Sequence, residues 1–514
     1  MTLDFTDHYY ASGTAPEGFV SPRIDTGRWP DTRIQWSPRV GFNWAVTGTG
    51  DAVVRGGAGV FKGRIPLVFF TCIPNYSGML QNTVMVTNDK NGVLSGLAGD
   101  GFRTDEEGLR NYITGLTDAS GNRLYPMQSG TGTVISNATV CGVDPEFRLP
   151  SVLKASLAAD LKLPLAFPAA ITVEGIWNKD INAVYTENLN IRNGESFARF
   201  EGADDRIDYR RNADGTPSGS PLVDGRVSPS GGAMIIRNTD KGYSWSAGVT
   251  LTAEPLRGLD AEVSYIHTDA RSVSDMTGSA LYSTWSNTAS VNGPNEAVER
   301  ISGYVIPDKV TAALTYSFSG RRVRTSAGIF YTGHTAGTYS YVYSNDMNGD
   351  GVNNDLIRIP ASKEEIQFAD NGEYTAARQQ EAFWAFVNQD RYLSAHKGGY
   401  AGAYAARMPW LNRFDLHVGE RFKVFGVRGK ANWIELSADL MNAGNLINSR
   451  WGVSQTPSAC NNGKLLSYVR TDESGRPVFT MASNADGLVS RTFEPLKSTA
   501  NCWYLQVGVR IVFE

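Results

Sequence analysis

One stretch of the sequence has the residue types and the spacing of a loop that binds a metal ion. It reads Asp346-Met-Asn348-Gly-Asp350-Gly, the D-x-N-x-D-G start of a calcium-binding loop. Carboxylate and amide oxygens at alternate positions suit a hard cation, and glycine at the sixth position allows a sharp turn. The acid expected at the twelfth position is missing, because Ile357 stands there. We therefore expect a structural calcium ion or another cation, with these ligands: Asp346, Asn348, Asp350, Asn354 and Asp355.

Asp355 is the substitute for the missing acid in this interpretation. The bound cation would stiffen an extracellular loop, and no catalytic role is expected for it. The alternative is a metal-free turn, rich in Asp and Asn, that caps a long loop, because these side chains readily bond to their own backbone.

The second group of residues with chemical potential is the four cysteines Cys72, Cys141, Cys460 and Cys502. In an exported protein, an even number of cysteines placed in loops predicts disulfides. Cys460 and Cys502 stand at opposite ends of the last long loop, and closing that loop would contribute ~4 kcal/mol in the chain-entropy model. Cys72 and Cys141 would fasten an earlier long loop in the same way. The alternative is four free thiols in a chain that is never exported.

Signals for catalysis are weak. The histidines are scattered without zinc-ligand spacing, and there is no nucleophile elbow, phosphate-binding loop or paired-cysteine motif. Acidic pairs such as Asp204-Asp205 fall in polar loops and are typical of solvated surface. We predict that the protein is not an enzyme and needs no organic cofactor.

The elements that must position these residues are predicted to be β-strands. Apolar and polar residues alternate along the chain, and in a strand successive side chains point to opposite sides. In one of these runs the polar positions are Arg413, Asp415 and His417, and we predict that they form a polar stripe facing a water-filled interior. The clearest apolar set closes the chain: Trp503, Leu505, Val507, Val509, Ile511 and Phe513.

Such runs, with weaker ones near 3–10 and 169–190, number about twelve, joined alternately by short turns and long polar loops. Short turns on one side and long loops on the other are typical of outer-membrane β-barrels. We therefore predict that these strands and loops belong to one transmembrane barrel domain. The long loops cover about 63–150, 191–235, 273–302, 346–408 and 453–500.

Two features are predicted inside the fourth loop. Phe383, Phe386 and Val387 have helical spacing, which favours a helix packed in a small satellite core or in a loop cap that contacts a ligand. Ser362 and Glu365 have the spacing of a capping box, which marks the start of a helix.

Composition agrees with a barrel and excludes other classes. Charged residues make up only 19%, below the roughly 25% of soluble domains, while the chain holds 54 glycines and 22 tyrosines. A net charge of −4 gives no basic face for nucleic acid. No stretch approaches the ~20 apolar residues of a transmembrane helix. A soluble β-sandwich also alternates, but charges on nearly every polar face and aromatics near strand ends favour a barrel.

The N-terminus carries none of the features of a signal peptide. Met1-Thr-Leu-Asp-Phe5 has no basic region, apolar core or cleavage site, which taken literally would predict a cytoplasmic protein. We expect a truncated chain instead, because Met1 falls within an alternating run.

Six segments, taken in order, resemble the Oar-like TonB-dependent receptors of bacterial outer membranes. SPRVGFNWAVTGTGDAVVRGGAGVFKGRIP (37–66) is similar to a mid-barrel hairpin, and ELSADLMNAGNLINSRWG (435–452) is similar to the penultimate strand and the following loop. The other four resemble later parts of the same family: NTDKGYSWSAGVTL (238–251), YSNDMNGDGVNNDLIRIP (343–360), EAFWAFVNQDRYLSAHKG (381–398) and PWLNRFDLHVGERF (409–422).

The resemblance implies an all-β fold in which the whole chain, 1–514, is the C-terminal part of one transmembrane antiparallel barrel domain of roughly 22 strands. The family's signal peptide, regulatory domain, TonB box and plug domain have no counterpart in this sequence. A fragment inactive on its own is therefore expected, because lipid cannot satisfy the open edges of an incomplete barrel.

The function implied is energised uptake of a bulky substrate across the bacterial outer membrane. The implied partners are outer-membrane lipid, TonB acting through a plug domain missing from this chain, the barrel-assembly machinery that reads the final strand, and an unknown extracellular ligand. No nucleic acid is expected. The alternatives are an outer-membrane adhesin or structural surface protein and, third, a secreted soluble β-rich protein.

Overall fold

A large antiparallel sheet dominates the computed structural model, which describes residues 29–76, 106–117, 121, 139–223, 227–228, 231–427, 430–458 and 463–513. Among the described residues the sheet has 12 strands, close to the predicted number, although β12, which pairs only with β11, falls within a segment predicted as a loop. The predicted strand near 3–10 lies outside the described residues. In spatial order the strands are β1 (Arg39–Ala45), β2 (Ala52–Lys62), β4 (Ser151–Lys162), β5 (Ala169–Asp180), β10 (Tyr243–Leu256), β11 (Leu259–Ser272) with β12 (Arg300–Ile301), β13 (Asp308–Ser319), β14 (Val323–Thr335), β18 (Trp410–Val427), β19 (Lys430–Met441) and β26 (Tyr504–Phe513).

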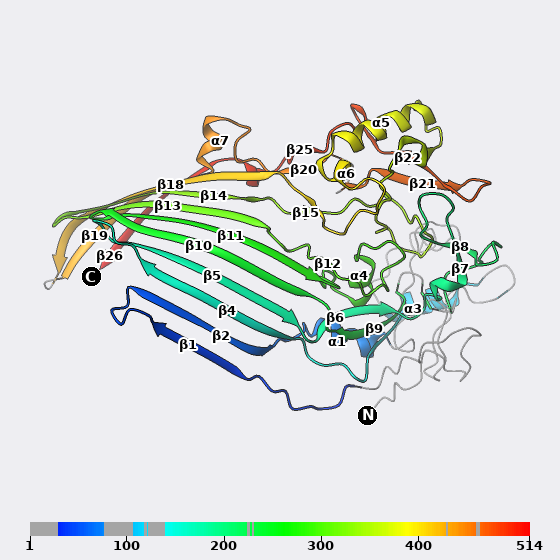
Figure 1. Cartoon of the computed structure of the whole chain (residues 1–514), viewed down its shortest axis with the longest axis horizontal. Coiled ribbons are helices and arrows are strands. Elements are labelled where there is room, and N and C mark those ends of the chain that lie inside the picture. The colour runs from blue at the N-terminus through cyan, green and yellow to red at the C-terminus, as the bar shows by residue number, and fades with distance from the viewer. Residues whose placement is uncertain are drawn as a thin grey trace.

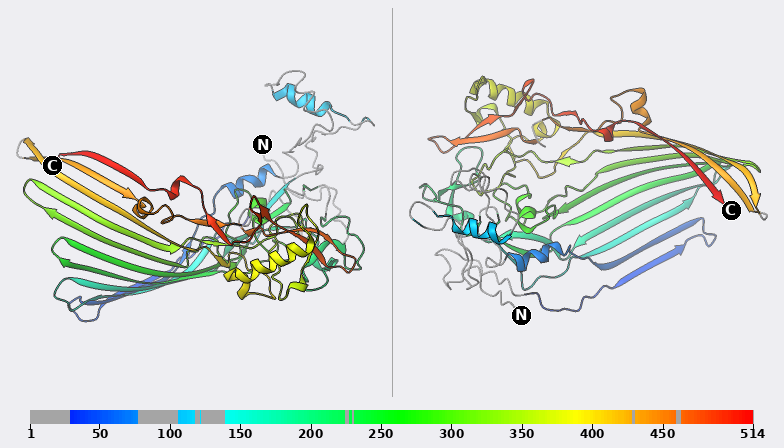
Figure 2. Two further views of the ribbon diagram at one scale, coloured as in Figure 1. Left: turned by 90° about the horizontal axis from the view of Figure 1, so that it is seen from above. Right: turned by 180° about the vertical axis from the view of Figure 1, so that it is seen from behind.

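The register of the sheet places the apolar positions of neighbouring strands on one face. Leu314 stands opposite Ile329, which stands opposite Leu416, and the row continues through Leu440 to Leu505. The sheet forms a long curved wall, and the folded loops gather at one end of it (Figures 1 and 2). We call the apolar side the outer face.

Side chains of the outer face are exposed rather than packed under a second layer. Val418 is 55% exposed and Val507 is 69% exposed, although both are aliphatic and lie in the middle of long strands. Soluble proteins rarely leave so large a continuous apolar surface uncovered. A wall that is apolar over its whole height is the surface that a β-barrel presents to lipid.

Aromatic residues mark both ends of the apolar band. Trp177 of β5 pairs directly with Trp245 of β10 near the end of the sheet where the long loops begin. Tyr316, Phe318 and Phe422 lie near the opposite end, beside the short turns. Aromatic rings prefer the two interfaces of a membrane, so these belts show where the bilayer would begin and end.

The opposite, inner face carries polar and charged pairs that bridge neighbouring strands. Arg55 Nε donates to Asp160 Oδ2 at 2.9 Å, linking β2 to β4. On the other half of the sheet His417 Nδ1 lies 2.6 Å from Asp439 Oδ1, and Arg421 Nε donates to Glu435 Oε2 at 2.9 Å. Charged pairs of this kind line a water-filled interior.

The segments between the long strands form further elements. They are α1 (Val68–Asn75), α3 (Glu106–Gly115), β3 (Val140–Val143), β6 (Ala183–Asn188), η1 (Gly194–Ser196), β7 (Phe197–Arg199), β8 (Ile207–Asn212), β9 (Ala233–Thr239), α4 (Leu281–Ser286), β15 (Thr338–Tyr339), η2 (Lys363–Glu365), β16 (Gln367–Phe368), α5 (Ala376–Gln389), α6 (Arg391–Ala395), β17 (Ala406–Arg407), α7 (Ala443–Ile447), β20 (Gln455–Pro457), β21 (Leu466–Thr471), β22 (Pro477–Met481), β23 (Ser483–Asn484), β24 (Gly487–Leu488), β25 (Phe493–Pro495) and η3 (Thr499–Asn501). None of the described helices is both long and apolar enough to cross a membrane.

Most of these elements build a folded body, which we call the cap. It comprises the described parts of 63–150, 181–242, 273–307, 336–409 and 453–503. The last four of these segments begin before or extend beyond the loops predicted from the sequence. In the second, β6 leaves the large sheet and pairs with β9 instead of prolonging β5.

The buried core of the molecule lies mainly in the cap. Its largest cluster joins α5 to the β21–β22 hairpin and to the segment around Tyr341. Phe383, Phe386 and Val387 of α5 are all buried in it, so the predicted packed helix is confirmed. The predicted capping box is confirmed in its position only: the single turn η2 begins directly after Ser362, but the side chain of Ser362 makes no capping hydrogen bond.

Candidate functional site

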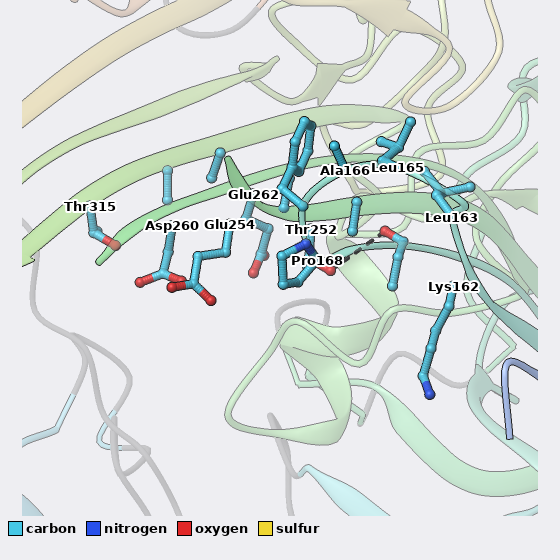
Figure 3. A pocket seen from close by; sticks show the side chains of 16 residues that line it. Lys162, Leu163, Leu165, Ala166, Pro168, Thr252, Glu254, Asp260, Glu262 and Thr315 are labelled. Carbon is cyan, nitrogen blue, oxygen red and sulfur yellow. Dashed lines mark hydrogen bonds between the residues drawn. The ribbon is translucent and has the colours of Figure 1, made fainter. Parts of the chain in front are cut away.

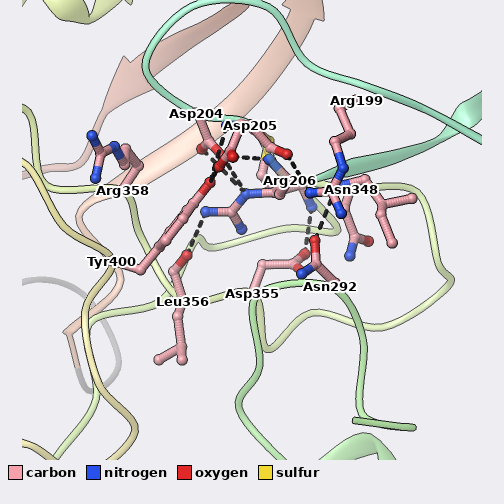
Figure 4. A network of polar contacts seen from close by, with 12 residues as sticks. Arg199, Asp204, Asp205, Arg206, Asn292, Asn348, Asp355, Leu356, Arg358 and Tyr400 are labelled. Atoms are coloured by element: carbon pink, nitrogen blue, oxygen red, sulfur yellow. Dashed lines mark hydrogen bonds and ion pairs between the residues drawn. The ribbon is translucent and has the colours of Figure 1, made fainter. Parts of the chain in front are cut away.

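A buried arginine joins two of the loop segments that build the cap. Arg206 lies in the turn between β7 and β8, and its side chain is completely buried. Its Nε donates to both carboxylate oxygens of Asp204, at 2.9 and 3.2 Å. Its Nη2 donates to the carbonyl oxygen of Leu356 at 2.6 Å, which lies 150 residues further along the chain (Figure 4).

Two tyrosines enclose this guanidinium group. The Arg206 Cζ atom lies 5.0 Å from the ring centre of Tyr343 and 5.2 Å from that of Tyr400. The Tyr400 hydroxyl oxygen is 2.9 Å from Oδ1 of Asp204 and 2.7 Å from Oδ1 of Asp205. Burial raises the pKa of both tyrosines, so each stays a neutral hydrogen-bond donor. The cluster locks segment 181–242 to segment 336–409.

The sequence did not reveal this cluster. Asp204-Asp205 is typical of solvated surface by sequence, but Asp204 is buried and that interpretation is wrong for it. The one signal available is the alternation of Asp204, Arg206 and Asp208, which places three charges on one side of an extended segment, and all three are buried.

The predicted cation loop lies directly beside the arginine cluster. Asp346 accepts hydrogen bonds from the backbone of Gly349 at 2.6 Å and of Gly351 at 3.0 Å. Asn348 Oδ1 accepts from Asp350 N at 3.0 Å. Both glycines have positive φ angles, +85° and +95°, which let the loop turn sharply.

Four of the five predicted ligands are gathered in this loop. Asp350 and Asp355 are almost completely buried, and Asp355 Oδ2 accepts from Met347 N at 2.8 Å. Asn354 differs, because its side-chain amide donates to the carbonyl oxygen of Ser286 in another segment. Among the described residues, no group of three His, Cys, Asp or Glu side chains is arranged to hold a metal ion. The cation site stays a prediction, and the metal-free turn accounts for the contacts present.

The buried acids of this loop have unusual titration behaviour. Burial raises the pKa of Asp350 well above its ordinary value, and the charges of Asp355 and Asp346 raise it further. Burial also raises the pKa of Asp355, to about 7, against the opposing charge of Arg206. At neutral pH the loop therefore holds acids that resist ionisation, unless a positive charge joins them.

The stability of the cap should therefore depend on pH. Between the unfolded-state pKa of about 4 and the folded-state pKa of about 7 for Asp355, the folded cap binds a proton that the unfolded chain has released. Stability is thus highest below this window, falls as pH rises through it, and stays low above it. Asp350 also has a raised pKa and therefore has the same effect. We expect Asp350→Asn to raise the melting temperature in mildly alkaline buffer and to flatten the dependence of melting temperature on pH. Thermal unfolding of the chain in detergent micelles measures both.

The exposed Asp486 provides the matched control, because Asp486→Asn should leave the pH profile unchanged. Excess calcium separates the two interpretations of the loop. If the loop binds the cation, calcium stabilises the parent chain in alkaline buffer and has little effect on Asp350→Asn. An equal response of both chains, or none, would establish the metal-free turn.

The cysteines fall in two different situations. Cys141 is buried on β3, and Cys72 belongs to α1, which packs against β3; Cys141 N donates to Tyr76 O at 2.8 Å at that contact. Cys502 is exposed at the end of η3, and Cys460 lies outside the described residues. Both predicted disulfides, Cys72–Cys141 and Cys460–Cys502, stay predictions.

The cap contains a hollow large enough for a ligand. It has a volume of about 710 Å³ and lies between η1, β7, β8 and the turn around Asn292. Its aromatic part is the pair Phe197 and Tyr209, whose ring centres are 4.7 Å apart, with the Arg192 guanidinium 4.6 Å from the Phe197 ring centre. The Tyr209 hydroxyl donates to Asn292 O at 2.9 Å. Aromatic faces beside polar groups suit a ligand with both apolar and hydrogen-bonding surfaces.

A second hollow, of about 910 Å³, lies at the other end of the sheet (Figure 3). It is bounded by the short turn 163–168 and by inner-face residues of β10, β11 and β13. Glu254, Asp260 and Glu262 point into it, while Lys162 lies at its edge. This end of the inner face therefore has an acidic surface that suits a cationic segment.

A family model described as outer membrane beta barrel domain matches residues 6–470. No curated protein matches the sequence. The outer membrane transporter YddB from Escherichia coli is similar with a TM-score of 0.36 and 10% identity, over 93% of this chain and 40% of that one.

Two further solved structures are similar at low identity. The ferric enterobactin receptor of Pseudomonas aeruginosa gives a TM-score of 0.37 and 8% identity, over 93% of this chain and 40% of that one. BauA, the ferric preacinetobactin receptor from Acinetobacter baumannii, gives 0.29 and 8%, over 87% of this chain and 34% of that one. The chain thus spans about 40% of the length of the first structure it matches.

Proposed function

The chain belongs to the outer membrane β-barrel domain family. From that premise we propose that it forms part of the wall and the loop cap of a TonB-dependent receptor, which takes up a bulky substrate. The observation that carries the proposal is the two-sided sheet with a folded cap at one end. One face is apolar and exposed, the other carries charged pairs, and the cap lies at the end of the sheet where the long loops begin.

The cap is the part that would contact the substrate outside the cell. A receptor loop must keep its shape to select a ligand, and the buried contact of Arg206 with Asp204 and Leu356 holds two loops in one arrangement. The hollow beside Phe197 and Tyr209 offers a place for a substrate that combines apolar and polar groups. Siderophore, peptide and glycan all meet that description.

The inner face is the part that would meet a plug. Asp260 and Glu262 are exposed acids on the inner face at the short-turn end, the periplasmic end in this proposal. A plug segment carrying Lys or Arg would find complementary charge there. Pulling on such a plug through TonB would open the interior, and the barrel wall itself needs no cofactor for that step.

The deciding experiment is genetic epistasis in the parent bacterium. The coding region for this chain is deleted in strains with and without TonB, and growth is compared with iron, peptide or glycan as the limiting nutrient in turn. A TonB-dependent receptor gives a growth defect in the strain with TonB and no further defect in the strain without it. Reintroducing the wild-type gene should restore growth.

The competing function, a surface adhesin, predicts a different result. An adhesin uses the rigid cap for contact alone, so its deletion lowers attachment to surfaces equally with and without TonB. A growth defect that adds to that of the TonB deletion would also contradict the uptake role.

A further inference from the structure

A short rigid projection stands off the outer side of the sheet. It consists of residues 442–452, which include α7, and we call it the knob. In Figure 1 it lies beyond β18, on the side of the sheet away from the inner face. Three of its large apolar side chains face outward: Leu446 is 50% exposed, Trp451 is 55% exposed and Ile447 is 78% exposed.

The exposure of these side chains is not the result of a loosely held loop. Asn442 adopts a left-handed conformation with φ +51°, and its Nδ2 donates to Gly452 O at 3.2 Å and to Asn501 O at 3.0 Å. Asn445 Nδ2 donates to Trp451 O at 3.0 Å. These bonds close both ends of the knob onto each other and onto η3.

The knob is also fastened to the wall of the sheet. Asn442 N donates to Asp415 Oδ1 of β18 at 2.7 Å, and Trp503 N donates to Asn445 Oδ1 at 3.2 Å immediately before β26 begins. Five hydrogen bonds therefore hold the apolar side chains of the knob in an exposed position. Such an arrangement needs a partner that covers the apolar side chains.

The outer face of the sheet continues into the knob without a break. Leu440 and Leu505 are paired on the last outward row of β19 and β26, and the exposed Trp503 follows directly above them. The knob thus begins at the level where the apolar band ends and the long loops start. In a barrel, that level is the interface between lipid tails and headgroups.

The order of residues in the knob matches that position. Leu446 and Ile447 are followed by exposed polar residues, then by Arg450 and Trp451. Tryptophan prefers the membrane interface, and arginine beside it can reach lipid phosphates while its stem stays in apolar surroundings. A protein partner covering so small a convex projection would need a matching pocket, whereas lipid adapts to it.

We propose that the knob is an interfacial anchor, in which Leu446, Ile447 and Trp451 insert into the outer leaflet beside β19 and β26. The inference rests on the proposed membrane-spanning role of the sheet and adds a contact outside the strands. Its consequence is to fix the depth and tilt of the wall on this side, because the knob resists movement of the sheet toward either side of the membrane.

The test uses the full chain in lipid vesicles made with acyl chains brominated either close to the headgroup or near their ends. Bromine quenches tryptophan only at short range. The chain has 11 tryptophans, so the signal of one is obtained as the emission of the parent chain minus that of Trp451→Phe. We expect this difference emission to lose most of its intensity with bromine close to the headgroup and little with bromine near the chain ends.

Trp384 of α5 provides the matched control, because it lies in the cap far from the apolar band. The emission obtained with Trp384→Phe should be quenched by neither lipid. If the total emission is quenched but the Trp451 difference is not, the anchor is overturned while the membrane role of the sheet stands. If no emission is quenched at all, the membrane role itself fails. A change of oligomeric state on Trp451→Phe, without quenching, would show instead that a second copy covers the knob.

Discussion

Arg206→Ala is expected to open the cap while the strands of the large sheet stay folded. The guanidinium is fully buried, and its removal leaves the Asp204 carboxylate buried without its counter-charge and the Leu356 carbonyl without its donor. Breaking a buried ion pair by removing one partner costs about 3–5 kcal/mol. Hydrogen exchange on the chain in micelles measures the result, with loss of protection in 200–212 and 343–359 and unchanged protection in β10 and β11.

Two further variants make this expectation specific. Arg199 donates to Asp205 O at 2.7 Å from an exposed position, so Arg199→Ala should change protection only slightly. Arg206→Met combined with Asp204→Leu removes both charges and should recover part of the lost stability, because Asp204 no longer leaves a carboxylate buried without its counter-charge. Equal effects of Arg199→Ala and Arg206→Ala would mean that the arginine cluster does not hold the loops together.

The large sheet could be predicted because the pattern that marks each strand lies within the sequence of that strand. Successive residues of a barrel strand face lipid and water in turn, so every strand repeats the same alternation of apolar and polar residues along its own sequence. The row from Leu314 through Ile329 to Leu416 illustrates this, since each member was assigned to the apolar face from its immediate neighbours. Hydrogen bonding between adjacent strands then follows from chain order with short turns.

The cap was much less predictable because its contacts are distant in sequence. Residues Ala233 to Ile236 of β9 are buried on both faces, which removes the alternation that would have marked a strand. The β9 strand pairs with β3, more than ninety positions earlier, and in parallel. Nothing local in either segment specifies that partner. By contrast α5 was found, since the spacing of Phe383, Phe386 and Val387 is itself local.

The candidate site shows the same division between local and distant information. The spacing of Asp346, Asn348 and Asp350 identified the turn-forming loop, and the turn is present. Its burial, and the position of Arg206 against Leu356 and Asp355, depend on a segment about 150 residues away. Burial raises the pKa of Asp355 while the charge of Arg206 opposes the rise, so the chemistry of the loop could not be derived from its spacing.

Val249→Arg is expected to be among the most damaging single changes in the sheet. Val249 lies in the middle of β10 on the outer face, paired with Val173 and Tyr265. A cation at the midplane of the lipid-facing side of a barrel costs about 2–4 kcal/mol. Urea unfolding of the chain in lipid vesicles should show this loss as a lower midpoint with an unchanged slope.

The neighbouring position supplies the control that separates a lipid face from an ordinary packed sheet. Thr250 points to the inner face, where its hydroxyl donates to Ser264 Oγ at 3.0 Å, and Thr250→Arg places the same cation in a watery interior. We expect a loss below about 1 kcal/mol for that variant, as for most surface substitutions. If the two variants were equally harmful, or if Thr250→Arg were the worse one, the apolar side chains of β10 would have to be buried against protein. Because every long strand has the same alternation of apolar and polar residues, that single result would contradict the assignment of a lipid-facing side and a water-facing side for the entire sheet.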